Sequence, residues 1–130
     1  MAIRGIGSDV IEVSRIERLR DTYGERFFKR VYTKGEIAYC ESKENPAEHL
    51  AGRFAAKEAV FKLIGTGWRG KIAWTDIEVV NDSLGRPEVV ITGEVKKLVE
   101  QSGIEQITIS ITHTANFAIC SAVALRNTDG

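Results

Sequence analysis

The sequence predicts an α+β fold in which helices pack against an antiparallel sheet. Helix and strand patterns are mixed along the chain without the strand–helix–strand regularity of doubly wound folds. The second half is dominated by pairs of strands joined by short links, which is typical of antiparallel sheets. The 130 residues fit a single domain, residues 1–130, that can bury a core without disulfide bonds.

The first predicted element is a strand over residues 2–13, where β-branched residues are frequent. Gly5 and Gly7 interrupt it, and glycine inside a strand indicates a bulge or the close approach of another backbone. Asp9 lies in the same strand, where aspartate is unfavourable. Asp9 is therefore a candidate site residue, although placement at a turn or a sheet edge explains most such aspartates.

Three helices are predicted from end signals in the first half. The SRIE sequence at residues 14–17 has capping-box spacing, which predicts a helix from Arg15 to a stop at Gly24. The TKGE sequence at residues 33–36 has the same spacing and starts a second, short helix. The third helix is predicted over residues 46–64, with proline in its first turn and glycine directly after its end.

The second half begins with a glycine-rich loop and continues into strand pairs separated by a short helix. The predicted elements are the loop 65–71, strands 76–81 and 88–92, a helix over 93–103, and strands 106–112 and 117–125. The last two strands are nearly all small or apolar, as expected for strands buried on both faces.

Composition excludes several classes of protein. The 18 basic and 18 acidic residues give zero net charge, whereas a protein that binds nucleic acid through phosphates usually has a basic excess. No segment approaches the roughly 18 apolar residues of a membrane helix, and the N-terminus lacks the apolar stretch of a signal peptide. Cys40 and Cys120 are too few for a disulfide framework and are predicted to be reduced and buried. The expected location is the cytoplasm, with no nucleic acid or membrane partner.

Charged residues interrupt the apolar pattern of the third helix. On a helical wheel Lys57 falls inside the apolar stripe and Glu58 falls on its rim. In one interpretation Glu58 pairs with Lys62 one turn on, while Lys57 and Arg53 extend their charged ends to solvent. In the other, the helix faces a cleft, with Glu58 directed at a cation and the basic residues at an anion. The pattern alone leaves both open; His49 is interpreted as a surface residue.

Two further segments have groups suited to phosphate. Ser110 and His113 lie at the end of a strand, where hydroxyl and imidazole groups can donate to phosphate oxygens, although a lone histidine is more often structural. The loop 65–71 exposes backbone N–H groups, although a helix stop followed by a turn is the more common explanation. Asp9 and Glu58 supply the oxygen ligands that a hard cation such as Mg²⁺ prefers.

Three stretches together resemble the holo-acyl-carrier-protein synthases, the small bacterial type of 4′-phosphopantetheinyl transferase. GIGSDVIEV, residues 5–13, is similar to the N-terminal strand signature of that family. RFAAKEAVFKLIGTG, residues 53–67, is similar to its central helix and the loop that follows. ISITHTANFAICSAVA, residues 109–124, is similar to its C-terminal strand pair. The three motifs stand in the family's order.

The resemblance implies that Asp9 and Glu58 hold a Mg²⁺ ion that bridges the pyrophosphate of coenzyme A. Lys62 is expected on the phosphates, and His113, together with Ser110, is expected to contact a phosphate of the coenzyme. Asp9, Glu58, Lys62 and His113 are the catalytic residues that this resemblance implies.

Other residues are expected around the same coenzyme. Lys57 is expected to bridge the coenzyme phosphates or a neighbouring carboxylate. The loop beside the pantetheine and the nucleotide is expected to comprise Gly65, Thr66 and Gly67. The residues expected near the 3′-phosphate and the adenine are Arg53, Arg86 and Pro87.

The family's reaction transfers 4′-phosphopantetheine from coenzyme A to a serine of apo acyl carrier protein and releases adenosine 3′,5′-bisphosphate. It supports fatty acid biosynthesis, and the base is open between metal-bound water and Glu58. The resemblance further implies a homotrimer with sites at subunit interfaces and docking of the carrier at Arg15. Two rival functions are a non-catalytic module that binds coenzyme A and a different Mg²⁺-dependent nucleotide hydrolase.

Overall fold

The computed structural model describes residues 1–65 and 72–128. Within them the elements are β1 (Ala2–Glu12), α1 (Val13–Tyr23), α2 (Glu25–Val31), α3 (Lys34–Glu41), α4 (Pro46–Ile64), the 3₁₀ turn η1 (Trp74–Asp76), β2 (Ile77–Asn81), β3 (Pro87–Ile91), α5 (Gly93–Gln101), β4 (Gln106–His113) and β5 (Phe117–Arg126).

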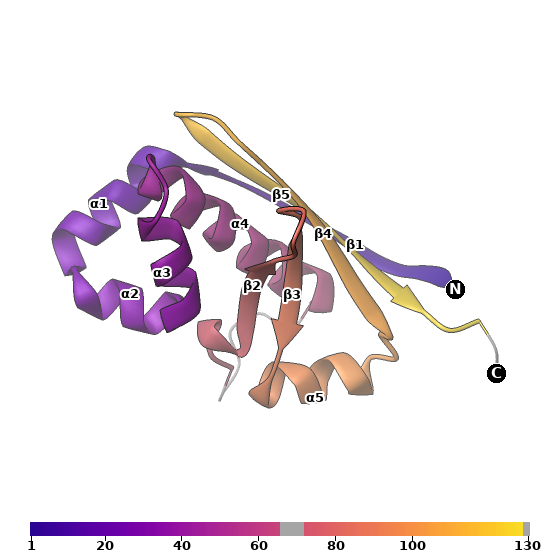
Figure 1. Cartoon of the computed structure of the whole chain (residues 1–130). Coiled ribbons are helices and arrows are strands. Elements are labelled where there is room, and N and C mark those ends of the chain that lie inside the picture. Colours follow the sequence, from indigo (N-terminus) through magenta and orange to yellow (C-terminus); the bar gives the residue numbers. More distant parts are fainter. Residues whose placement is uncertain (66–71, 129–130) are drawn as a thin grey trace.

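The strands form two antiparallel sheets. A three-stranded sheet has the order β1-β5-β4, and β2 pairs with β3 in a separate hairpin. The helices of the described residues all lie on one side of the three-stranded sheet, and none of these residues covers its other face (Figure 1). The start of β1 and the end of β5 lie side by side, with Ala2 paired to Arg126, at the end of the sheet away from α1, α2 and α3 (Figure 1). The predicted α+β class with antiparallel strands is confirmed.

The central element is α4, which packs along the inner face of the three-stranded sheet. Between Leu50 and Phe61 every residue of α4 except Glu58 is buried. The helix has alanine at four of these positions, all fully buried, so the sheet can approach its backbone closely: Ala51, Ala55, Ala56 and Ala59. Opposite them, Gly7 of β1 lies against the helix, and a Cβ atom there would overlap the carbonyl oxygen of Ala59. The predicted close approach at Gly7 is confirmed.

The helix ends follow the sequence signals in part. Thr33 and Glu36 form the predicted capping box of α3, and Gly65 ends α4 in the left-handed conformation with φ of 77°. The predicted cap at Ser14 is wrong, because α1 starts at Val13, two residues before the predicted Arg15, and follows directly from the strand with Glu12 as its N-cap. The N–H group of Val13 donates to the carbonyl of Asn116 at 2.9 Å, so a backbone group takes the place of a capping side chain.

Candidate active site

Two acids and a lysine lie together where β1 meets α4. We call Asp9, Glu58 and Lys62 the acidic cluster. Asp9 lies on the inner face of β1, opposite Cys120 of β5, and this face covers α4. Lys62 donates from Nζ to Asp9 Oδ1 at 2.9 Å and to the carbonyl of Ser8 at 3.2 Å. Of the two interpretations left open, pairing of Lys62 with Glu58 along the helix is not the contact found, since the Lys62 ammonium reaches Asp9 on β1.

Glu58 completes the cluster. Burial raises the pKa of its carboxyl, and the neighbouring Asp9 raises it further, while the cations Lys62 and Arg15 oppose the rise. The hydrogen bond and charge of Asp9 in turn raise the pKa of Lys62. The carboxylates of Asp9 and Glu58 thus repel each other, and Lys62 offsets this repulsion only in part. A further positive charge at this place would therefore be favourable.

This pair of acids fits Mg²⁺. In the described residues no group of three or more His, Cys, Asp or Glu side chains could hold a metal. Magnesium is usually held by one or two protein carboxylates, while waters and substrate phosphates fill its other positions. Asp9 and Glu58 match that donor set for an ion shared with a phosphorylated ligand.

A basic pocket lies on the side of α4 away from the acidic cluster. It has a volume of about 210 Å³ and is lined by Tyr39, His49, Gly52, Arg53, Asn81, Gly85, Pro87, Ile111 and His113. Arg53 is 4% exposed and donates to Asn81 Oδ1 at 2.7 Å, with its guanidinium over the Tyr39 ring. Within residues 1–65 and 72–128, the buried Nε atom of Arg53 has no hydrogen-bond partner. The pocket therefore has a cation held in place by its neighbours, which suits an anion.

Three predicted residues, Arg53, Pro87 and His113, meet in this basic pocket. Arg86, in the turn between β2 and β3, is exposed and pairs with Asp82 at 3.4 Å instead of lining the pocket. Ser110 lies on the uncovered face of the sheet, since it stands three residues before His113 on β4. Ser110 and His113 therefore do not meet within one chain.

The sequence interpretation missed two ring side chains of the pocket, Tyr39 and His49. His49, interpreted as a surface residue, contacts the rings of Tyr39 and His113 at centroid distances of 6.0 and 4.7 Å. Burial lowers the pKa of His49, and the neighbouring His113, Lys43 and Arg53 lower it further. A histidine in the first turn of a helix carries no sequence signal that separates this position from an ordinary surface one.

Lys57 has a different role from the one expected at the coenzyme phosphates. Its ammonium is fully buried and lies 2.7 Å from Glu36 Oε1. It also donates to the carbonyls of Val31, Trp74 and Ile77, at 2.7, 3.2 and 2.6 Å. Of the two expectations, the contact with a neighbouring carboxylate is the one observed, and burial leaves no surface of Lys57 for a phosphate.

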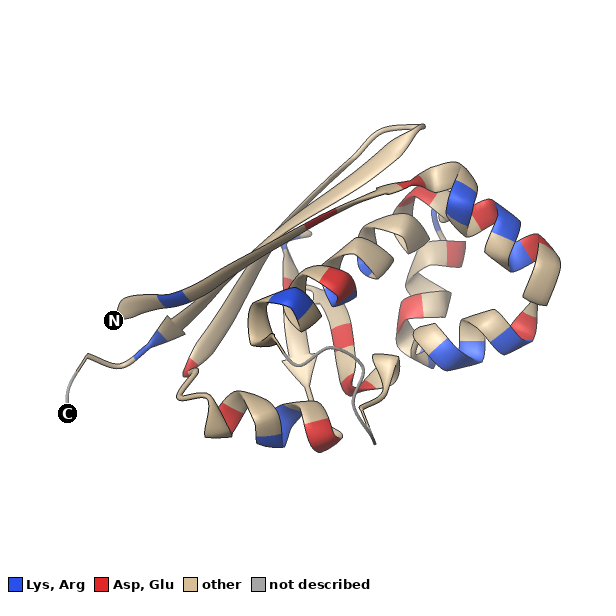
Figure 2. Cartoon of the chain, turned by 180° about the vertical axis from the view of Figure 1, so that it is seen from behind, with Lys and Arg blue, Asp and Glu red and all other residues tan. Residues whose placement is uncertain are grey.

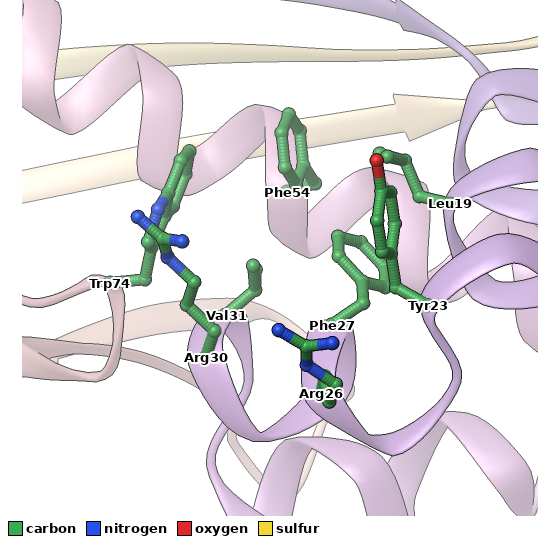
Figure 3. Close-up of a pocket in the computed structure, with 8 residues that line it drawn as sticks. All are labelled: Leu19, Tyr23, Arg26, Phe27, Arg30, Val31, Phe54 and Trp74. Carbon is green, nitrogen blue, oxygen red and sulfur yellow. The ribbon is translucent and has the colours of Figure 1, made fainter.

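An open cavity lies between α1, α2, α4 and η1. Its volume is about 720 Å³, and its lining combines aromatic and aliphatic side chains with two arginines of α2 (Figure 3): Leu19, Tyr23, Arg26, Phe27, Arg30, Val31, Phe54 and Trp74. Arg15 of α1 lies near it, with its guanidinium 5.7 Å from the centre of the Phe54 ring. The cavity thus adjoins the acidic cluster through Arg15, which also acts on Glu58.

Two expected residues, Thr66 and Gly67, lie outside the described residues. Gly65, which precedes them, is the left-handed cap of α4. Cys40 and Cys120 are free and buried as predicted, and burial raises the pKa of their thiols to about 11 and about 12. Among the described residues, none of the helices has the length and apolar character needed to cross a membrane.

Fold and site define a small α+β protein with paired carboxylates on one flank of a central helix and a basic pocket on the other. A sequence profile described as the 4′-phosphopantetheinyl transferase superfamily matches residues 5–120. The chain belongs to this superfamily and, within it, to the holo-acyl-carrier-protein synthases. It is thus an enzyme of the phosphopantetheinyl transferase class.

The relatives are similar over nearly their whole length. The holo-acyl-carrier-protein synthase of Solibacter usitatus is 47% identical over 121 residues, which cover 93% of this chain and 97% of that protein. The protein of the same name from Halothermothrix orenii is 50% identical over 121 residues, which cover 93% of this chain and 96% of that protein.

Solved structures agree in fold. The holo-acyl-carrier-protein synthase of Neisseria meningitidis has a TM-score of 0.87 at 34% identity, covering 96% of this chain and 100% of that one. The Helicobacter pylori synthase in complex with coenzyme A has a TM-score of 0.81 at 28% identity, covering 92% of this chain and 99% of that one.

Proposed function

We propose that this protein transfers the 4′-phosphopantetheine group of coenzyme A to a serine of an apo acyl carrier protein, with Mg²⁺. The observation that carries the proposal is the meeting of Asp9, Glu58 and Lys62 across the contact between β1 and α4. The names of the relatives and the coenzyme A bound to the Helicobacter pylori enzyme support the substrate pair. The further product is adenosine 3′,5′-bisphosphate, and the carrier is that of fatty acid biosynthesis in the cytoplasm.

Each side chain of the acidic cluster has a separate task in this reaction. Asp9 and Glu58 would hold the ion, which when bound neutralises charge on the coenzyme pyrophosphate. Lys62 is 56% exposed, so it can turn from Asp9 to a phosphate oxygen, and a lysine ammonium is cationic near neutral pH. It donates where negative charge develops as the serine oxygen bonds to the β-phosphorus and the bond to the leaving phosphate breaks.

The basic pocket is proposed to hold the distal end of the coenzyme. Arg53 supplies a fixed positive charge for a phosphate, and His113 supplies a hydrogen-bond donor. Pro87 presents an apolar surface that can pack on the adenine. In this proposal Lys62 contacts the pyrophosphate of coenzyme A, and Arg53 contacts the distal end of the same elongated molecule.

The two halves of the site are proposed to come from different chains of a homotrimer. Glu58 stands five positions after Arg53 on α4, which turns their side chains about 140° apart. The acids adjoin β1, whereas His113 lies on β4, at the opposite edge of the sheet order β1-β5-β4. The halves thus point away from each other within one chain, and a second copy would bring complementary halves together.

The uncovered face of the sheet is the proposed surface for assembly. Large apolar side chains stand on it, with exposed fractions from 46 to 68%: Ile6, Val10, Phe117 and Ile119. The strands β4 and β5 are almost free of charged residues, whereas charges alternate along α1 and α2 (Figure 2). An apolar sheet face of this kind is covered in a stable protein.

The carrier protein is proposed to dock at the open cavity between α1 and α2. Arg15, Arg26 and Arg30 stand around apolar side chains there, which suits an acidic partner with an apolar patch. Since Arg15 also lies close to Glu58, a carrier bound at this surface would present its serine near the acidic cluster.

The test is mass spectrometry of an apo acyl carrier protein incubated with this protein, coenzyme A and Mg²⁺. A gain of one phosphopantetheine, lost with a chelator and in Asp9→Asn and Glu58→Gln, is the expected result. Both variants are expected to remain folded, because each removes one of two mutually repelling charges. Breakdown of coenzyme A without a carrier would instead support a hydrolase, and coenzyme binding without transfer would support a non-catalytic module.

A further inference from the structure

A carboxylate and a second imidazole hold His113 at the rim of the basic pocket. Glu48 Oε1 lies 3.1 Å from His113 Nδ1, with the two side chains 18% and 29% exposed. The His49 ring contacts the His113 ring at a centroid distance of 4.7 Å and an interplanar angle of 65°. Glu48 and His49 lie in the first turn of α4, and His113 ends β4, so this cluster joins a helix start to a strand end.

The contact with Glu48 determines which ring nitrogen of His113 carries the proton. An ionised carboxylate only accepts hydrogen bonds, so the Nδ1 atom that faces it must be the donor. Within residues 1–65 and 72–128, Nε2 of His113 forms no hydrogen bond. When a phosphate oxygen arrives at the pocket, Nε2 can donate a hydrogen bond to it only if the ring is an imidazolium. In that form Nε2–H binds the phosphate while Nδ1–H still donates to Glu48.

We propose that Glu48 is a positioning residue that holds His113 through Nδ1–H and balances the imidazolium whose Nε2–H binds a coenzyme phosphate. This inference rests on the proposed function for the identity of the ligand. The contact fixes the ring plane together with His49, which prevents rotation away from the pocket. A carboxylate behind an imidazole orients the ring and stabilises its charged form, as in other sites where histidine binds or transfers a charge.

The surrounding charges make the carboxylate necessary. From α4, Arg53 and His49 face this region, and Lys43, directly beyond α3, adds a further cation. Tyr39 of α3 contributes a neutral ring, and Asn81 of β2 an amide. Glu48 thus places a negative charge among these basic side chains. This charge offsets the repulsion between them and an imidazolium at His113.

The variant Glu48→Gln separates positioning from simple charge repulsion, because the two roles predict opposite signs. Glutamine keeps the shape and removes the negative charge. If Glu48 only repelled the coenzyme phosphates, its loss would tighten binding. If Glu48 positions His113, its loss weakens coenzyme A binding about five- to tenfold, measured by calorimetry. The control is Glu44→Gln, which removes the same charge from an exposed residue just before α4 and should leave affinity unchanged.

A double-mutant cycle shows whether Glu48 acts through His113. In a His113→Ala background, Glu48→Gln should change the affinity for coenzyme A less than twofold, because its target is gone. A full effect in that background, or tighter binding by Glu48→Gln alone, would overturn the proposal.

Nitrogen NMR of the histidine rings tests the same contact without coenzyme. In the neutral imidazole of the wild type the proton should lie on Nδ1, and Glu48→Leu, which removes the acceptor oxygen, should shift it towards Nε2. An Nδ1 proton that persists in Glu48→Leu would contradict a role for Glu48. If the wild type does not bind coenzyme A, the proposed function fails, and this measurement still decides whether Glu48 sets the state of His113.

Discussion

At the scale of the residue, three charges on α4 have three different surroundings. Lys57 is enclosed by the core and by Glu36, Glu58 faces Asp9, and Arg53 lies in the basic pocket. Burial lowers the pKa of Lys57, whereas the adjacent Glu36 opposes this and favours its charged form. One helix therefore contributes to the core and to both halves of the site through neighbouring positions.

The variant Lys57→Met should destabilise the fold and leave the coenzyme site intact. It strands the carboxylate of Glu36 in the core without its cation, which costs about 3–5 kcal/mol of unfolding free energy. Chemical denaturation measures this loss. The matched control is Lys62→Met, on the same helix but 56% exposed, which should cost less than about 1 kcal/mol and yet abolish transfer. If Lys57→Met kept full stability but lost affinity for coenzyme A, Lys57 would bind the coenzyme phosphates and this account of it would be wrong.

Sequence reasoning identified Asp9 and Glu58 because acids in a strand and within an apolar helix break a pattern. It could not choose the partner of Lys57, since Glu36 lies on another helix and the contact depends on how α3 and α4 pack. His49 and Glu48 break no pattern at the start of a helix, so their contact with His113 becomes visible only in three dimensions.

At the scale of the element, the approach of β1 to α4 brings the two acids together. Gly7 makes this approach possible, because a side chain there would meet the backbone of α4 at Ala59 and Leu63. The sequence predicted the long elements with clear end signals, including the whole of α4. It did not predict α2, whose seven residues have Gly24 as N-cap and no capping side chain.

The variant Gly7→Ala should separate β1 from α4. Its Cβ overlaps a backbone oxygen that cannot rotate away, so we expect a loss of about 3 kcal/mol of unfolding free energy and weaker Mg²⁺ binding. Thermal unfolding and metal titration measure the two effects. Gly5→Ala is the control on the same strand, because its nearest neighbour would lie at 3.8 Å, an ordinary contact. Equal behaviour of the two variants would show that the approach at Gly7 is not needed.

At the scale of the whole molecule, the helices cover one face of the three-stranded sheet, and no part of the chain that the structure describes covers the other, apolar face (Figure 1). The sequence indicated apolar strands in the last segment, but a pattern cannot show whether the second face is covered by the same chain or by another. The helical spacing of Arg53 and Glu58 already turns them apart, but the residues of β1, β2 and β4 that join each of them follow from packing.

Assembly through this face is tested by Ile119→Glu. Ile119 is 46% exposed and stands beside Val10 in the sheet, so a charge there should prevent association with little effect on the fold of one chain. Sedimentation should give the mass of a trimer for the wild type and of a monomer for the variant. Val90→Glu, a change of the same kind at a 44% exposed position on β3, should remain a trimer. A trimeric Ile119→Glu would place the interface elsewhere.

The central claim is that one transferase site combines the acids of one chain with the basic pocket of another. The direct test mixes two variants that are each inactive alone, Asp9→Asn and His113→Ala, by refolding them together in equal amounts. In random trimers about a quarter of the interfaces would pair an intact acid cluster with an intact basic pocket. We predict that the mixture regains phosphopantetheine transfer to the carrier at about a quarter of the wild-type rate. A mixture that assembles but stays inactive would contradict the shared site.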